Sequence, residues 1–300
     1  MSREQEGVVQ LFTTLVPGPR FSEWAGIAPR YIALDVDGTV TAGNGVSPRV
    51  RAARHLLRPT GIRVGAATGR AAEFMESVSA VLDYDAPSIL QNGAEIWADG
   101  KVVQRRGLGR DRTDTLRELA GREGLFLELF DANGGWFVSE YDAFLAEFGQ
   151  HLSAANGQLP QVLPESSIDA VKGTIIVFSA RHADRLSRSI ASIGLACEAH
   201  GVPTESGHVY LNITDPLATK GDAVKVVAGE LGVSLAETLV VGDGANDISM
   251  MKVAGTAIAM GQADEIIAAH AHLIAPNVFD DGAADVLEFV AARAQAPALR

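Results

Sequence analysis

Two carboxylates follow the first apolar segment of the chain and are separated by one residue. Residues 32–34 lead into Asp35, Val36 and Asp37, and Gly38 then permits a sharp turn. Side chains two positions apart on a strand point to the same side, so Asp35 and Asp37 can face one site at the carboxyl end of the strand. There they would bind a cation or act as a nucleophile and an acid. A strand end with two solvated carboxylates is the structural alternative.

Two further positions suit a small anion. Thr68, Gly69 and Arg70 follow another apolar segment, and a hydroxyl, a glycine amide and a helix N-terminus at one place can cradle such an anion. Lys220 opens a predicted helix, where its charge is unfavourable toward the helix dipole, and a bound phosphate would give it a reason to be there. Taken alone, these positions can also be explained as a helix cap and a solvated lysine.

A fourth segment delivers another carboxylate. The apolar residues 240–241 are followed by Gly242-Asp243-Gly244-Ala245-Asn246-Asp247, so Asp243 stands at the end of a predicted strand and Asn246 and Asp247 start a helix. Oxygen ligands at the edge of a parallel sheet suit a hard cation such as Mg²⁺. Helix capping by Asn246 or Asp247 is the alternative.

The elements that must position these residues alternate along the chain. Near-continuous apolar strands are predicted at 31–34, 62–67, 88–90, 238–241, 257–260 and 272–274. Helices are predicted at 47–57, 71–82, 221–231, 246–253, 264–270 and 283–294. This alternation is typical of an α/β fold with a parallel sheet covered by helices on both faces. We therefore expect the four motifs to meet at one edge of that sheet.

The middle of the chain has a different pattern and predicts an α+β insertion. Strands are expected in pairs, at 126–130 with 136–141 and at 195–200 with 208–213, joined by turn-forming loops at 131–135 and 201–207. Helices at 111–123, 142–156 and 182–193 and a strand at 174–178 lie among them. The predicted organisation is an N-terminal extension at 1–30, a core domain in two segments at 31–94 and 210–300, and an inserted domain at 95–209.

The charge balance limits the possible partners. Lys and Arg number 25 against 37 Asp and Glu, a formal net charge of −12. A basic face for nucleic acid or for an anionic membrane is therefore not expected, whereas a locally positive pocket still permits a small anionic substrate. The single cysteine, Cys197, excludes an internal disulfide. With no apolar run long enough to span a membrane and no signal-peptide pattern, the expected location is the cytoplasm.

In this order, the four motifs resemble those of the haloacid dehalogenase (HAD) superfamily. Asp35-Val36-Asp37-Gly38-Thr39 resembles its first motif, Thr68 its second, Lys220 its third and Gly242–Asp247 its fourth. The GDGxND form of the fourth motif, with Asn92-Gly93-Ala94 after the second, is similar to the Cof-type (class IIB) branch. The resemblance covers about residues 31–275 and implies a Rossmann-like, doubly wound core with an inserted cap of C2 type (C2B). Gln262 stands where this branch usually has Asn.

The resemblance also implies how a phosphoryl group is handled. Asp35 would attack phosphorus and form an aspartyl-phosphate, and Asp37 would protonate the leaving oxygen and later take a proton from water. Thr68 and Lys220 would hold the other phosphoryl oxygens. Supporting phosphate contacts are implied for Gly38, Gly69 and Asn246.

A metal ion is implied at the same place. Mg²⁺ would be held by Asp35, by the backbone carbonyl of Asp37 and by Asp243, with Asp247 orienting either Lys220 or a metal-bound water. The ion would offset the repulsion between a carboxylate and a phosphate.

The expected function is a Mg²⁺-dependent phosphomonoester hydrolase that acts on a small phosphorylated metabolite, a sugar phosphate or sugar-acid phosphate, as a monomer or homodimer. Two alternatives remain open, a phosphomutase on the same scaffold and a non-catalytic module that binds Mg²⁺ or phosphate. A dinucleotide-binding protein is not expected because no G-x-G-x-x-G follows the first strand.

Overall fold

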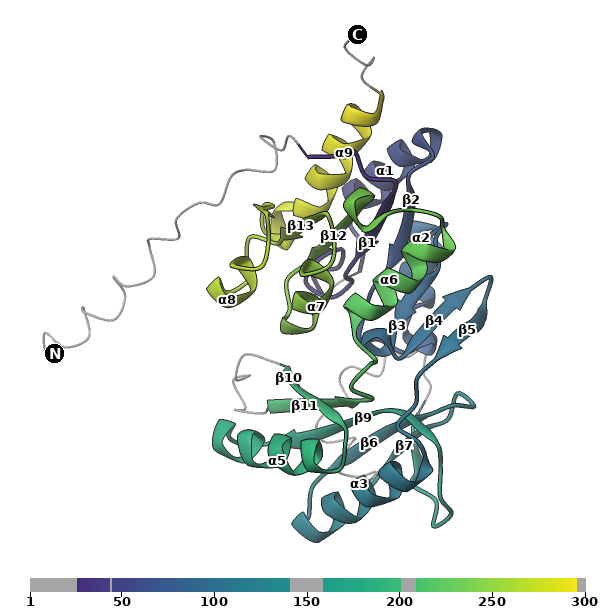
Figure 1. Ribbon diagram of the computed structural model, residues 1–300, viewed down its shortest axis with the longest axis vertical. Coiled ribbons are helices and arrows are strands. Elements are labelled where there is room, and N and C mark those ends of the chain that lie inside the picture. Colours follow the sequence, from purple (N-terminus) through teal and green to yellow (C-terminus); the bar gives the residue numbers. More distant parts are fainter. Residues whose placement is uncertain (1–25, 44, 141–158, 201–208, 296–300) are drawn as a thin grey trace, which may run out of the picture.

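The computed structural model describes residues 26–43, 45–140, 159–200 and 209–295 (Figure 1). Most of the predicted N-terminal extension, the helix predicted at 142–156 and the loop predicted at 201–207 lie outside these residues. The described chain forms two lobes, with the first and last elements together in one lobe and the middle elements in the other (Figure 1).

The first lobe is built on a parallel five-stranded sheet, as the alternating pattern predicts. Its strand order is β14-β13-β12-β1-β2. The strand β1 (Tyr31–Leu34) lies between the edge strand β2 (Arg63–Ala66) and the middle strand β12 (Thr238–Gly242), and Tyr31 is in register with Arg63 on one side and Thr238 on the other. The strands β13 (Thr256–Ala259) and β14 (Leu273–Ile274) complete the far edge. The centre of the sheet thus joins segments about two hundred residues apart.

Helices cover both faces of this sheet because successive strand residues point to opposite faces. Ile32 and Leu34 pack in one apolar cluster with α1 (Pro48–Leu57) and α9 (Gly282–Gln295). Tyr31 and Ala33 pack in a second cluster with α6 (Lys220–Glu230) and α7 (Ile248–Met251). The expected doubly wound architecture is confirmed.

The helix predicted at 71–82 is interrupted. The chain forms a 3₁₀ turn at Ala72–Phe74 and then α2 (Glu76–Leu82). The guanidinium of Arg70 donates to the carbonyl of Phe74 at 3.0 Å, while the amide of Val78 turns to Met75 instead. Arg70, which belongs to the predicted anion-binding segment, thus bonds to the Phe74 carbonyl. In a continuous helix this carbonyl would accept from the amide of Val78.

The strand predicted at 88–90 belongs to a different sheet. β3 (Ser88–Leu90) pairs antiparallel with β4 (Glu95–Ala98), which pairs with β5 (Lys101–Arg105), and only a single bridge between Ala67 and Ile89 links it to the end of β2. Three residues in a row with positive φ, Gln91, Asn92 and Gly93, reverse the chain after β3 and send it back as β4. The antiparallel pairing follows from this turn.

The second lobe is a six-stranded sheet with helices on one face. Its order is β10-β11-β9-β6-β7-β8, with all pairs antiparallel except β7–β8. The strands are β6 (Leu127–Asp131), β7 (Trp136–Val138), β8 (Gln161–Val162), β9 (Ala170–Val177), β10 (Ala196–His200) and β11 (Val209–Thr214). The helices α3 (Arg110–Glu123) and α5 (Ala180–Ser192) share an apolar cluster with them. The α+β insertion is confirmed, and we call this lobe the cap.

The β3–β4–β5 sheet packs with the first lobe. Ile89 and Ile96 lie in the same apolar cluster as Tyr31 and Val224. This packing favours a domain boundary after β5 rather than after residue 94, and the predicted domain limits remain a proposal.

The helix α8 (Glu265–Ala268) follows β13. In the described part of the chain, no helix combines the length and the apolar character that crossing a membrane requires.

Candidate active site

The predicted motifs follow three neighbouring strands and therefore meet at one edge of the core sheet. Asp35 comes directly after β1, Thr68 lies just beyond β2, and Asp243 comes directly after β12. Backbone bonds extend the pairing to this edge, since the amide of Asp35 donates to Val241 at 2.9 Å and that of Ala67 donates to Leu34 at 2.8 Å. The chain is therefore held in sheet register up to the residues that carry the chemistry.

Lys220 lies beneath this edge and is bonded to two carboxylates. Its Nζ donates to Asp35 Oδ1 and to Asp247 Oδ1, each at 2.6 Å, and its side chain is fully buried. Burial alone would lower the pKa of Lys220, but the charges of Asp247 and Asp35 raise it, so the ammonium form is maintained. Two buried carboxylates therefore account for a cation at the first position of α6.

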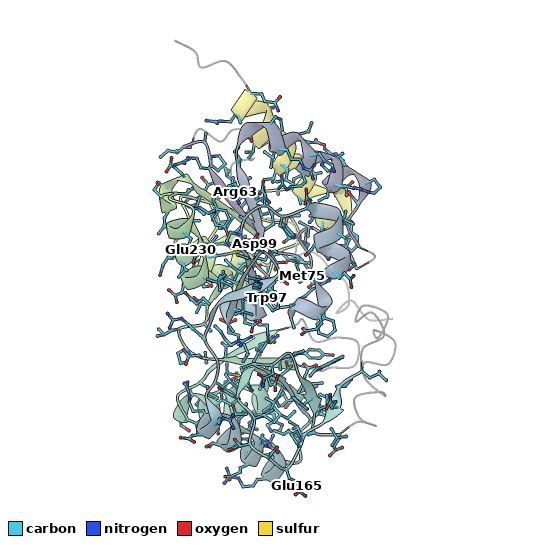
Figure 2. All side chains as sticks on the ribbon, turned by 90° about the vertical axis from the view of Figure 1, so that its right-hand side faces the viewer. Arg63, Met75, Trp97, Asp99, Glu165 and Glu230 are labelled. Atoms are coloured by element: carbon cyan, nitrogen blue, oxygen red, sulfur yellow. The ribbon has the colours of Figure 1, made fainter. Side chains whose placement is uncertain are left out.

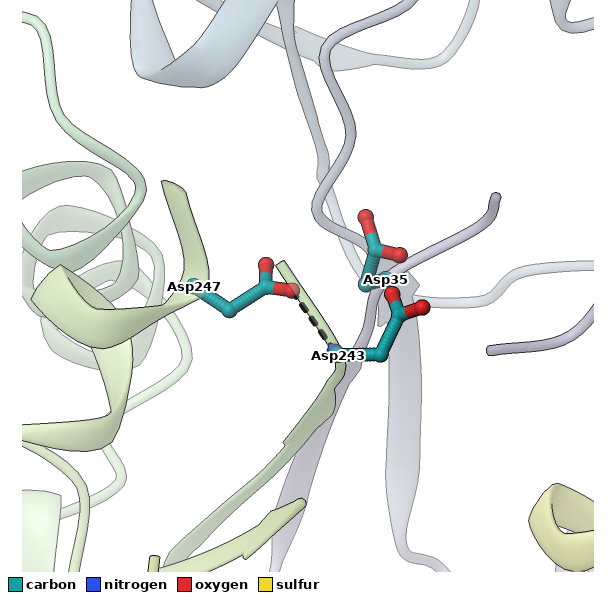
Figure 3. A group of neighbouring side chains, drawn as sticks. All are labelled: Asp35, Asp243 and Asp247. Atoms are coloured by element: carbon teal, nitrogen blue, oxygen red, sulfur yellow. Dashed lines mark hydrogen bonds between the residues drawn. The ribbon is translucent and has the colours of Figure 1, made fainter. Parts of the chain in front are cut away.

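Asp247 positions this ammonium and also holds the loop after β12. Its Oδ2 accepts from the amides of Asp243 and Gly244, both at 2.9 Å, and the first of these bonds is drawn in Figure 3. Both of its oxygens thus accept bonds from the protein, and the residue is completely buried. Of the two implied roles for Asp247, these contacts favour the orientation of Lys220.

Three of the predicted metal ligands form a cluster. Asp35, Asp243 and Asp247 each offer one oxygen within 4.8 Å of the others (Figure 3). The carboxylate of Asp37 is not part of this cluster, so a metal contact through its backbone carbonyl remains a prediction. The donors are all oxygens, as Mg²⁺ prefers.

The charge around this cluster fits a cation. Burial raises the pKa of Asp35 well above its ordinary value, the charge of Asp247 raises it further, and the bonded Lys220 only partly offsets this. Burial likewise raises the pKa of Asp243 to about 6. Because a single ammonium faces three carboxylates, negative charge is left over, and a divalent ion would neutralise it.

Gly38 and Gln262 hold Asp243 in place. A Cβ on Gly38 would lie 2.0 Å from Asp243 Oδ2, and the φ of Gly38 is +82°, so only glycine fits there. The Nε2 of Gln262 donates to the carbonyl of Gly38 at 2.5 Å and to Asp243 Oδ2 at 3.0 Å, while its Oε1 accepts from the amide of Val278 at 3.0 Å. Gln262, where the sequence departs from the usual Asn, thus connects three segments of the site.

Arg70 holds the second carboxylate of the first motif. Its Nε and one of its terminal nitrogens donate to the two oxygens of Asp37 at 2.9 and 2.5 Å. The backbone amide of Arg70 donates to Thr68 Oγ1 at 3.1 Å. Because the Thr68 hydroxyl accepts this bond, its proton is left to donate to an anion.

Two asparagines connect the loops after the core strands. Asn246 Nδ2 donates to Asn92 Oδ1 at 3.0 Å, and both residues are buried. Asn92 Oδ1 would also be 2.9 Å from a Cβ placed on Gly69, so the loop after β2 passes close to it. Asn92 was identified in the sequence only as part of a subclass motif, and the structure gives it a place in the site.

A pocket of about 240 Å³ opens among these residues. Its walls include six of the predicted site residues, Asp35, Asp37, Thr68, Gly69, Asp243 and Asn246, and also Arg70, Asn92, Gly244, Lys172 and Asn212. Lys220, Asp247 and Gly38 do not line the pocket. Lys220 contacts the lining residue Asp35, and Asp247 and Gly38 contact the lining residue Asp243. Lys172 and Asn212 come from the cap and were not found from the sequence, although a lone lysine in the apolar segment 170–177 was a signal.

A larger cavity lies elsewhere. It measures about 670 Å³ and is bordered by Arg63, Met75, Trp97, Asp99 and Glu230, which Figure 2 labels, among other residues. None of the predicted site residues lines it. The chemistry of the side chains therefore identifies the site better than the size of the cavity does.

Comparisons with known proteins agree with this geometry. Residues 32–287 match the family model of the haloacid dehalogenase-like hydrolases. Among solved structures, the chain is similar to the subclass IIB sugar phosphatase BT4131 (21% identity, 86% of this chain and 98% of the other, TM-score 0.72). It is also similar to the phosphatase BT1666 from Bacteroides thetaiotaomicron (24%, 89% and 99%, 0.72). A third similar structure is a haloacid dehalogenase-like hydrolase from B. subtilis (23%, 86% and 99%, 0.73).

These similarities confirm the expected fold of a parallel core sheet with a separate cap sheet. The family model spans the core segments on both sides of the cap, including all four motifs. The chain therefore belongs to the haloacid dehalogenase-like hydrolase family.

Proposed function

We propose that this protein is a Mg²⁺-dependent phosphatase that hydrolyses a small phosphorylated metabolite through an aspartyl-phosphate on Asp35. The observation that carries the proposal is the meeting of Asp35, Thr68, Asp243 and Asn246 around one pocket, with Lys220 bonded to Asp35 beneath it. The subclass IIB sugar phosphatase among the similar structures supports a sugar phosphate or sugar-acid phosphate as substrate and a class IIB assignment.

Asp35 has the contacts of a nucleophile. Lys220 holds one of its carboxylate oxygens, and the other accepts no hydrogen bond from the residues that the structure describes. In the first step, this second oxygen attacks phosphorus, a P–O bond to Asp35 forms, and the bond to the leaving oxygen breaks. Lys220 fixes the direction of the attacking carboxylate, which is a contribution to rate through orientation.

Proton transfer is assigned to Asp37, whose carboxylate Arg70 orients. Arg70 fixes both of its oxygens at the mouth of the pocket, where the side chain of Asp37 is 61% exposed. Asp37 gives a proton to the leaving oxygen in the first step. In the second step it takes a proton from the water that attacks the aspartyl-phosphate, so that phosphate leaves and Asp35 is regenerated.

The remaining groups stabilise the transferring phosphoryl group. Thr68 has a hydroxyl proton to donate, and Gly69 and Asn246 line the same wall. Asp35 and Asp243 would hold Mg²⁺, which supplies positive charge that lowers the repulsion between the carboxylate and the phosphate.

The test is hydrolysis of p-nitrophenyl phosphate and of a panel of phosphorylated sugars and sugar acids, with phosphate release measured in the presence of Mg²⁺. Asp35→Asn is expected to abolish turnover of every substrate, and Asp37→Asn to lower turnover of the sugar and sugar-acid phosphates by about 10²–10⁴-fold, as loss of a general acid does. Unchanged turnover in Asp35→Asn would contradict the proposal. Formation of an isomeric sugar phosphate in place of free phosphate would identify a phosphomutase.

A further inference from the structure

Lys172 reaches from the cap sheet into the pocket of the core. It lies on β9, next to Gly173, where a Cβ would contact Leu129 and Leu116 on the helix-covered face of the cap sheet. Because neighbouring strand residues alternate, Lys172 points to the opposite face. Its Nζ donates to the carbonyl of Gly69 at 3.1 Å, and only 8% of the residue is exposed.

The other cations near the pocket already have carboxylate partners. Lys220 is bonded to Asp35 and Asp247 and does not line the pocket, and Arg70 is bonded to Asp37. Lys172 lines the pocket and forms no ion pair within 4.0 Å with any carboxylate in the described part of the chain. It is therefore the lining cation whose charge remains for a ligand.

The surroundings of Lys172 leave its charge poorly compensated. Burial lowers the pKa of Lys172, and the charge of Glu128 offsets this effect only in part. Lys220 and, more weakly, Glu198 also act on it from a distance. Among the described residues, the close partner of Nζ is a carbonyl, and a buried ammonium in such surroundings is unfavourable unless an anion completes them. An anion at Nζ would complete these surroundings.

The position of Nζ indicates which part of a substrate supplies that anion. Lys172 contacts Gly69, the residue next to Thr68, in the loop that we expect to bind the phosphoryl group. A phosphoryl group has three terminal oxygens, so one can contact the Thr68 hydroxyl while another contacts Lys172. A leaving group would instead extend away from this loop, on the far side of phosphorus from the attacking Asp35.

We propose that Lys172 is a phosphate-binding residue contributed by the cap, and that its ammonium contacts a phosphoryl oxygen of every substrate. This inference rests on the proposed function. The binding site for the transferring group is then complete only when the cap lies over the core. Lys172 would act on the phosphoryl group common to all substrates rather than on the group that distinguishes them.

The experiment compares Lys172→Gln with Lys172→Arg and with a control, Lys101→Gln, which changes an exposed lysine on β5. Inorganic phosphate, which has no leaving group, is the main probe. Its inhibition constant is measured against p-nitrophenyl phosphate, and its binding is also followed by the thermal shift that it produces with Mg²⁺ present. KM values are measured for p-nitrophenyl phosphate, a sugar phosphate and a sugar-acid phosphate.

Lys172→Gln is expected to raise the inhibition constant of phosphate and all three KM values by a similar factor, about ten- to a hundredfold, as for a lost hydrogen bond from a charged group. The phosphate-induced thermal shift should disappear with it. Lys172→Arg should keep most of the phosphate affinity, and Lys101→Gln should match the wild type. If Lys172→Gln does not fold, Lys172→Met replaces it, because methionine is readily buried.

Two results would overturn the inference. One is an unchanged inhibition constant for phosphate, and the other is a KM that rises for some leaving groups but not for p-nitrophenyl phosphate. Both results can be distinguished from a failure of the proposed phosphatase function. If the wild type binds phosphate but hydrolyses nothing, the phosphatase proposal is wrong, while loss of phosphate binding in Lys172→Gln still supports the role of Lys172.

Discussion

Arg70 donates hydrogen bonds to both carboxylate oxygens of Asp37, at 2.9 and 2.5 Å, so the orientation of the proposed proton donor is fixed by the residue two positions after Thr68. A bidentate pair of this kind fixes orientation as well as charge. The loop after β1 and the loop after β2 are therefore coupled through the residue to which we assign proton transfer.

Arg70→Gln should impair the protonation of the leaving group more than any other step. For an alkyl phosphate, whose alkoxide leaves only when protonated, we expect kcat to fall by about ten- to a hundredfold. For p-nitrophenyl phosphate, whose phenolate leaves without a proton, the loss should be much smaller. The measurement is kcat for both substrates, with Arg49→Gln as a control, because Arg49 pairs with Asp285 and Glu288 outside the site. Equal losses for the two substrates would argue against this coupling.

Gly38→Ala should disable the proposed metal site, because the added methyl group would collide with Asp243. The new Cβ would meet Asp243 Oδ2, and we expect the apparent affinity for Mg²⁺ or the activity to fall by about ten- to a hundredfold or more. Gly43→Ala is a matched control, because Gly43 has nearly the same φ, +83°, but nothing within 4 Å of its Cβ position. Mg²⁺ titrations of activity for both variants make the comparison. Similar behaviour of the two would mean that backbone strain, not the contact with Asp243, sets the effect.

Gln262→Ala should weaken the response to Mg²⁺ while leaving the nucleophile intact. The side chain that joins Gly38, Asp243 and Val278 would be lost, and a supporting residue of this kind typically contributes about ten- to a hundredfold in metal affinity or activity. Activity should recover at high Mg²⁺, and Gln295→Ala at the end of α9 should behave as the wild type. A loss that no Mg²⁺ concentration restores would place the role of Gln262 elsewhere.

The stability of the metal-free protein should fall as pH rises through about 6. Burial raises the pKa of Asp243 to about 6, above its ordinary value of 3.8, so the folded state binds this proton more tightly than the unfolded state does. The stabilising contribution is fully present below pH 3.8 and is lost as pH rises through 6, and burial of Asp35 acts in the same direction.

Thermal unfolding with EDTA and with Mg²⁺ between pH 5 and 7.5 measures this effect. The increase in Tm that Mg²⁺ produces should grow with pH, because the ion binds the ionised carboxylates. In Asp243→Asn the growth should be reduced. A Mg²⁺ effect that is constant over this range would contradict the assignment of Asp243 as a ligand.

The convergence of Asp35, Thr68 and Asp243 was predictable from the sequence. Apolar strands with a polar residue at each carboxyl end imply a parallel sheet, and such ends meet at one edge. From the sequence, a bound phosphate was the expected partner of a lysine at the N-terminus of a helix, whereas in the structure Lys220 pairs with Asp35 and Asp247. A contact between Lys220 and Asp247 was implied only by the family resemblance.

The cross-links between the motifs were not predictable. Gln262 bridges to Asp243 and Lys172 reaches Gly69 across 103 positions, and neither contact follows from local spacing. β3 looked like a strand of the core sheet because its residues are apolar, but pairing is decided by the turn at Gln91–Gly93. The break after Phe74 depends on Arg70, a tertiary contact that helical periodicity does not contain.

The pairing of β1 with β12 has a consequence for synthesis of the protein. Tyr31 meets Thr238, so the ladder between β1 and β12 cannot form on the ribosome until about two hundred further residues have followed β1 out of the tunnel. The strands from 127 to 214 emerge earlier and pair among themselves, so the lobe that carries Lys172 has its partners at hand before the lobe that carries Asp35. Asp35 thus leaves the tunnel before the cap strands do and reaches its final surroundings after they have emerged.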